Sequence, residues 1–188
     1  MTPVRWDDLF DDLEAQLAEL EHADDAGEIA ERARAEVSKF RLVDRLRPAF
    51  GHRIAVTLIG GHRVEGTVTS VGQAWMLVRE DRGPEVLLPY LAVASVSGLG
   101  SLTAVPGSEG KVAARLTIGH ALRVIARDRA AVVVGLADGT LLTGTLDRVG
   151  ADFFEMAEHP VDEARRPGAV AGVRTVTYSG LALVRRHI

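Results

Sequence analysis

The sequence contains no cysteine, and Lys39 and Lys111 are its only lysines. The absence of cysteine excludes disulfide bonds, thiolate chemistry and cysteine-based metal sites. It also fits a reducing compartment. Aromatic residues make up 5% of the chain, whereas apolar residues as a group make up 47%, which is enough to build a core.

Long apolar runs are absent as well. No stretch approaches the roughly 20 apolar residues that a membrane-spanning helix needs. The segment from Met1 to Asp8 has no apolar core of the kind found in a secretory signal peptide. A cytoplasmic protein without membrane contact is therefore expected. The net charge of −4 and the pI of about 5.9 argue against non-specific binding to nucleic acid.

Residue patterns typical of catalysis are missing too. The six histidines show no metal-ligand spacing; they are His22, His52, His62, His120, His159 and His187. The acidic pairs Asp7-Asp8 and Asp11-Asp12 fall on the solvent face of a predicted helix. A catalytic pair of carboxylates needs partial burial to separate its two pKa values, and nothing in the sequence suggests such burial here. No serine stands in a nucleophile-elbow pattern. We therefore expect no enzyme activity, no catalytic residue, no metal, no cofactor and no small-molecule substrate.

The N-terminal segment has the periodicity of an amphipathic helix. Trp6, Leu9, Phe10 and Leu13 recur at spacings of three and four residues, and the opposite face is acidic. Asp25 and Glu28 form a capping-box pattern for a second helix, so the chain is expected to begin with a helical hairpin. The acidic face is either a solvated surface or an arm that binds a partner.

From residue 52 the apolar period changes to two, as in β-strands, and this pattern returns later in the chain. A shift of 78 residues superimposes three glycine pairs: Gly61 on Gly139, Gly66 on Gly144, and Gly72 on Gly150. We interpret these as structural glycines that form a hairpin turn, a bulge or bend within a long strand, and the next turn. Each repeat is predicted to be a helix followed by five short strands.

The repeated pattern resembles the Sm-like family of Hfq and the LSm proteins. The matching stretches are Val56 to Gly61 with Gly66-Thr67-Val68, and Val134 to Gly139 with Gly144-Thr145-Leu146. Other small five-stranded barrels, such as the PRC-barrel group, share much of this pattern, and an uncharacterised bacterial family is a further candidate. The resemblance implies an α+β fold, in which the N-terminal helical hairpin precedes two tandem helix-plus-five-strand small β-barrels.

Predicted boundaries follow from this interpretation. Residues 1–27 form the acidic amphipathic helix, 28–98 a helix with the first barrel, 99–108 a linker, and 109–188 a helix with the second barrel. The residues that bind uridine in Sm-like proteins are not matched here. Gly72 and Gly150 stand where that family has aspartate, and Met76 and Phe154 where it has asparagine.

Two binding functions remain open. The first is a non-enzymatic interaction and assembly module that binds protein partners. The alternative is an RNA- or single-stranded nucleic-acid-binding protein that uses arginines near aromatic side chains but lacks the usual uridine pocket. Residues proposed for interaction are Trp6, Leu9, Phe10, Leu13, Val86, Leu88, Arg165 and Arg166.

Self-association is a further expectation, because an open small barrel presents edge strands, here the fourth and fifth of each repeat. The fourth strand near Val86 to Leu88 and its counterpart near Val173 to Val176 are apolar and poor in charge. These edges either pair within one chain or join chains into a dimer or small ring. The competing possibility is a monomer whose helices cover the edges.

Overall fold

The computed structural model describes residues 31–32, 34–108, 116–160, 168 and 170–187. Its contacts divide the chain into two compact units, residues 1–40 and 41–188. In the first unit the described residues 31–32 and 34–37 are helical. The predicted N-terminal helix, with Trp6, Leu9, Phe10 and Leu13, lies outside the described residues.

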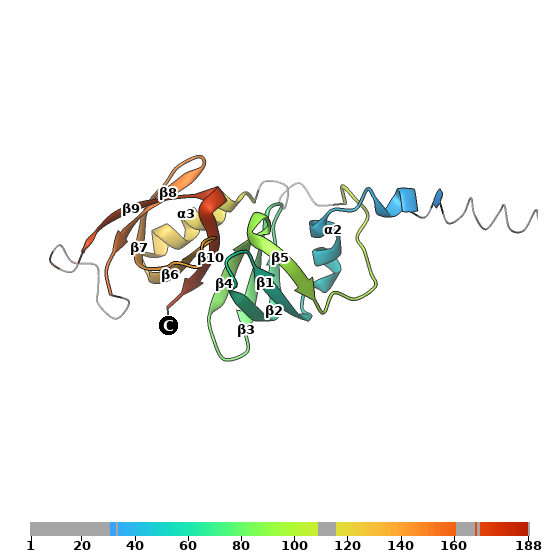
Figure 1. Ribbon diagram of the computed structural model, residues 1–188, viewed down its shortest axis with the longest axis horizontal. Coiled ribbons are helices and arrows are strands. Elements are labelled where there is room, and N and C mark those ends of the chain that lie inside the picture. Colours follow the sequence, from blue (N-terminus) through green and yellow to red (C-terminus); the bar gives the residue numbers. More distant parts are fainter. Residues whose placement is uncertain (1–30, 33, 109–115, 161–167, 169, 188) are drawn as a thin grey trace, which may run out of the picture. The chain divides into compact units, whose positions relative to one another are not determined.

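The second unit contains a single antiparallel sheet of ten strands, in the order β5-β1-β2-β3-β4-β10-β6-β7-β8-β9 (Figure 1). The first half of the sheet comprises β1 (Arg53–Leu58), β2 (Arg63–Val71), β3 (Trp75–Glu80), β4 (Glu85–Pro89) and β5 (Val93–Ser97). The second half comprises β6 (Ala131–Leu136), β7 (Leu141–Val149), β8 (Phe153–Glu158), β9 (Gly172–Thr177) and β10 (Leu181–Arg186).

Short helices accompany each half. In the first, α2 (Leu42–Leu46) and the 3-10 helix η1 (Arg47–Ala49) precede β1, and η2 (Tyr90–Ala92) joins β4 to β5. In the second, α3 (Ile118–Asp128) precedes β6 and packs against β7, and η4 (Tyr178–Gly180) joins β9 to β10. Thr117 caps α3 by accepting a hydrogen bond from the backbone N–H of His120.

The two halves have matching strand registers. In the first half Gly66 lies opposite Ile54 on β1 and Glu80 on β3. In the second, Gly144 lies opposite Val132 on β6 and Glu158 on β8, at the same shift of 78 residues. The alternating apolar residues that predicted these strands therefore occupy equivalent positions in both halves.

The topology contradicts the predicted barrels. In a closed five-stranded barrel the fourth strand would complete the ring within its own half. Here β4 instead pairs with β10 of the other half, and β5 pairs only with β1. Because these hydrogen bonds run from one half to the other, the sheet stays open and continuous. The resemblance to the Sm-like family, and the α+β fold of two tandem small β-barrels that it implied, are therefore wrong: the chain is mostly β and forms one large open sheet.

The second predicted helix, which precedes the first strands, is also interrupted. The chain turns at residues 38–39, and a separate helix, α2, begins after Arg41, whose backbone N–H donates to Asp44 Oδ2 at 2.9 Å. Asp44 is fully buried, and Arg47 pairs with it at 3.1 Å. The neighbouring Arg45 donates hydrogen bonds to the carbonyl groups of Gly100, Ser101 and Leu102. These bonds attach the chain that leaves β5 to the surface of α2.

Candidate functional site

The pairing of β4 with β10 joins the two halves. Leu87 lies opposite Val184, and Val86 opposite Arg185. The side chains of β10 are divided between the two cores: Leu183 packs in the core of the first half and Val184 in that of the second. Leu87, a residue of the first half, packs in the core of the second. Each half thus completes its core with a strand from the other, and we call this pairing the junction.

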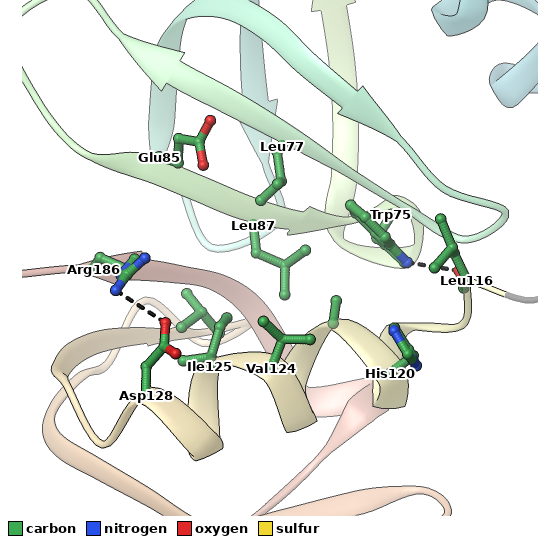
Figure 2. Close-up of a pocket in the computed structure, with 12 residues that line it drawn as sticks. Trp75, Leu77, Glu85, Leu87, Leu116, His120, Val124, Ile125, Asp128 and Arg186 are labelled. Carbon is green, nitrogen blue, oxygen red and sulfur yellow. Dashed lines mark hydrogen bonds and ion pairs between the residues drawn. The ribbon is translucent and has the colours of Figure 1, made fainter. Parts of the chain in front are cut away.

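Two polar contacts stabilise the junction. The Arg185 guanidinium pairs with Glu80 Oε1 at 3.0 Å, linking β10 to β3. The indole Nε1 of Trp75 donates to the carbonyl oxygen of Leu116 at 2.8 Å, just before α3 (Figure 2). Trp75 is 5% exposed, so its N–H finds a partner inside the core of the second half.

The outer strands β5 and β9 each have a strand on one side only, so among the described residues their other edges are unpaired. A shift of 88 residues places Pro89-Tyr90 on Thr177-Tyr178, so β9 is the counterpart of β4 and β5 the counterpart of β10. Counterparts of the two junction strands thus form the two ends of the sheet, and neither has a described strand on its outer side. We call these unpaired sides of β5 and β9 the free edges.

The register shows which peptide groups of β9 face outward. The backbone N–H of Tyr178 bonds to the carbonyl of Asp152 at 2.8 Å, and β9 then runs beside β8 without a register shift. Because antiparallel partners alternate, the peptide groups of Arg174 and Val176 point toward β8 and those of Val173, Thr175 and Thr177 point away. Val173 is also 63% exposed. This edge offers unpaired donors and acceptors beside β-branched side chains, as a strand-accepting surface requires.

The free edges are more polar than the junction. At the shift of 88, Leu87 corresponds to Thr175 and Leu183 to Ser95. Strand β5 carries no charged residue, and the charge on β9, Arg174, is held by Glu158 at 2.8 Å. Such polar edges limit irreversible aggregation while leaving the backbone groups accessible.

An apolar cavity of about 300 Å³ lies beside the junction, between α3 and the face of β3 and β4. Figure 2 shows Leu77 and Leu87 pointing from the sheet toward Val124 and Ile125 on α3. The Arg186–Asp128 ion pair, at 3.1 Å, lies at one end, and Trp75 and His120 lie at the other. Its lining brings together no nucleophile and base, and within the described ranges no group of three or more side chains could hold a metal ion.

The residues predicted for interaction are distributed unevenly. Trp6, Leu9, Phe10, Leu13, Arg165 and Arg166 lie outside the described residues. Val86 and Leu88 are both 0% exposed: Val86 lies opposite Arg185, and Leu88 packs in the core of the first half. Both side chains are therefore buried within the fold, and Val86 takes part in the junction.

The sequence marked the fourth and fifth strands of each repeat as edges, but it did not identify β10 as the particular partner of β4. Its residues Leu181-Ala182-Leu183-Val184 are four consecutive apolar side chains, all buried. The counterpart on β5 is Val93-Ala94-Ser95-Val96, with Ala94 and Ser95 exposed. A strand apolar on both faces is typical of the interior of a sheet, so this contrast was the signal that distinguished the joined strand from the free one.

Four of the six predicted structural glycines lie at the expected turns. Gly61 and Gly139 have φ of +87° and +90° at the hairpins β1–β2 and β6–β7. Gly72 and Gly150 lie against the rings of Trp75 and Phe153. Gly66 and Gly144 lie within β2 and β7 and were expected to form a bulge or a bend there. The bulges lie elsewhere, because the register shifts between Val68 and Ser70 and between Leu146 and Arg148.

Equivalent tyrosines secure the turns after β2 and β7. The Tyr90 hydroxyl donates to the carbonyl of Gly72 at 2.9 Å, and the Tyr178 hydroxyl to that of Gly150 at 3.0 Å. Burial raises the pKa of Tyr90 well above its ordinary value, although the nearby charge of Arg47 opposes this. The folded state therefore favours the neutral phenol, and this contribution is present below the ordinary tyrosine pKa of about 10 and is lost as the pH rises above it.

We expect Tyr90→Phe to lower the free energy of unfolding by about 1 kcal/mol at neutral pH, because the Gly72 carbonyl loses its donor. The variant should also lose less stability than the wild type on going to about pH 11, because the group that titrates is gone. Urea denaturation at both pH values measures this. An alkaline loss that is equal in both proteins would contradict the assignment.

Some of the groups that nucleic-acid binding would use are engaged within the fold. Arg79 pairs with Glu85, and Arg148 with Glu155. Of three aromatic rings near arginines, Trp75 is 5% exposed, Phe154 is 0% exposed and Phe153 is half-buried. Trp75 and Phe154 therefore lack the open faces that stacking on single strands requires.

No helix among the described residues is long and apolar enough to cross a membrane. Comparison of the chain with protein-family models, curated proteins and solved structures found no match in any of the three.

Proposed function

We propose that the chain is a non-enzymatic interaction and assembly module that binds protein partners by accepting an added β-strand at the free edges of β9 and β5. The observation that supports this is the junction, where β4 accepts β10 in the same manner. The counterpart of β4 is β9, whose outward peptide groups are unpaired among the described residues. Strand addition derives affinity from main-chain hydrogen bonds, so it tolerates the polar side chains of this edge.

A peptide with the sequence of residues 179–187, which contains β10, tests the proposal. Labelled with a fluorophore and titrated with the full chain, it should show saturable binding by fluorescence anisotropy. Thr175→Pro should abolish the binding, because proline removes an outward N–H from β9 without removing a bond to β8. Thr177, whose peptide group also points away from β8, is the counterpart of Pro89 on β4. A β4-type strand therefore already tolerates proline at an outward-facing position.

Matched controls separate strand addition from other contacts. Thr175→Val keeps the N–H and should bind at least as well as the wild type. A peptide with Val184→Pro should fail to bind, because it lacks the donor that faces β4 within the chain. Equal binding of the proline and valine variants would rule out strand addition at β9.

A further inference from the structure

We infer that the partner accepted at the free edges is a second copy of this chain, with β5 of one copy added to β9 of the next. This inference rests on the proposed function and specifies its partner. It comes from the repeat: the sheet already contains one contact between a β4-type and a β10-type strand. Its two ends carry one further strand of each type.

The junction specifies the register of this contact. Shifted by 88 residues, the pair Leu87–Val184 becomes Thr175 opposite Val96. The pair Val86–Arg185 becomes Arg174 opposite Ser97. The same antiparallel register places Val176 opposite Ser95.

The side chains fit this register. Thr175 and Val96 are both β-branched, a favourable cross-strand pair. Arg174 faces the small Ser97, and no like charges meet because β5 carries no charge.

The backbone fits this register as well. The backbone N–H of His187, the counterpart of Leu99, donates to the carbonyl of Ala131 and so faces β6. Peptide groups alternate in direction along a strand, so that of Val184, three residues earlier, faces β4. The equivalent group of Val96 faces outward toward an added strand.

The contact between copies is weaker than the junction. Thr175 and Ser95 stand where the junction buries Leu87 and Leu183, so less apolar surface leaves water. Association is therefore reversible and depends on concentration. It is also head to tail, so each added copy leaves one β5 and one β9 free, and the series either closes into a ring or extends.

Disulfide trapping tests both the partner and the register, because the natural chain has no cysteine to interfere. Chains carrying Arg174→Cys are mixed with chains carrying Ser97→Cys under mild oxidation. The peptide groups of Arg174 point toward β8, so Arg174 and Ser97 would form a non-hydrogen-bonded pair with Cα atoms about 4.5 Å apart. That separation lies within the disulfide range of about 4.4–6.8 Å.

We expect a covalent dimer of the mixed type, at least about tenfold more abundant than in either preparation alone or in the register control. The register control pairs Arg174→Cys with Ser95→Cys, whose diagonal separation of about 7–8 Å exceeds the disulfide range. Adding Thr175→Pro to the Arg174→Cys chain should suppress the dimer. A mixed dimer no more abundant than the register control, or one unaffected by Thr175→Pro, would overturn the inference.

The peptide titration and the disulfide trapping distinguish failure of the inference from failure of the proposed function. If the peptide binds β9 but no mixed dimer forms, the edge accepts strands and its partner is a different protein. If neither the peptide nor the second copy binds, both the inference and the proposed function are wrong.

Discussion

Replacing Gly66 or Gly144 by alanine is expected to lower the free energy of unfolding by at least about 3 kcal/mol, the range of the most damaging single substitutions. A Cβ at Gly66 would run into the carbonyl of Arg79 on β3, and one at Gly144 into the carbonyl of Ala157 on β8. These obstructing atoms belong to the neighbouring backbone, so relief requires the strands to separate and lose their ladder hydrogen bonds. Valine at either site should be at least as damaging.

Gly172→Ala is the matched control for this prediction. Gly172 lies in β9, yet nothing lies within 4 Å of where its Cβ would be. Its substitution should change stability by no more than about 0.5 kcal/mol. Thermal and urea denaturation of the three variants measure the difference. If Gly66→Ala melted like Gly172→Ala, the close approach of β2 and β3 would be incorrect.

Leu183→Ala should cost about 2–5 kcal/mol, as expected for truncation of a fully packed leucine. Leu183 is 1% exposed and belongs to β10, but it packs in the core of the first half. The loss should therefore destabilise the strands of both halves, and residues 41–188 should still unfold in one transition.

Two probes test this coupling. Circular dichroism reports the whole sheet, whereas tryptophan fluorescence, measured in chains carrying Trp6→Phe so that Trp75 alone emits, reports the region where β3 meets the core of the second half. Coincident transitions, both shifted by Leu183→Ala, are expected. The control is Ser95→Ala on β5, the exposed counterpart of Leu183, which should leave the midpoint nearly unchanged. Separate transitions would show that the halves fold independently.

Much of the local structure could be predicted from the sequence. The period-two stretches and the Gly60-Gly61 and Asp138-Gly139 turns mark strands and hairpins, because these patterns depend on neighbouring residues. The shift of 78 residues reappears in the strand registers for the same reason. Closure could not be predicted in this way. Whether β4 closes on its own half or accepts β10 depends on a contact between residues far apart in the sequence, and local periodicity is the same in both cases.

The candidate site was predictable in the same limited sense. The run Val86-Leu87-Leu88 was identified as a strand prone to pairing, but only the fold shows that this pairing occurs within the chain. The sequences of β5 and β9 are partly polar, and this polarity marks them as strands without an outer partner. Their serine and threonine residues stand where the junction has leucine, and this difference separates a free edge from a buried one.

The order of the strands also affects how the chain folds during synthesis. Strand β4 is made before the whole second half, whereas its partner β10 is made after every other strand of this sheet. Until β10 leaves the ribosome, the emerging first half lacks the strand that completes its core, and the apolar edge of β4 remains uncovered. This pairing of strands distant in sequence should make completion of the sheet its slow step. A newly made chain is therefore exposed to mispairing with its neighbours on the same messenger RNA until β10 has been made.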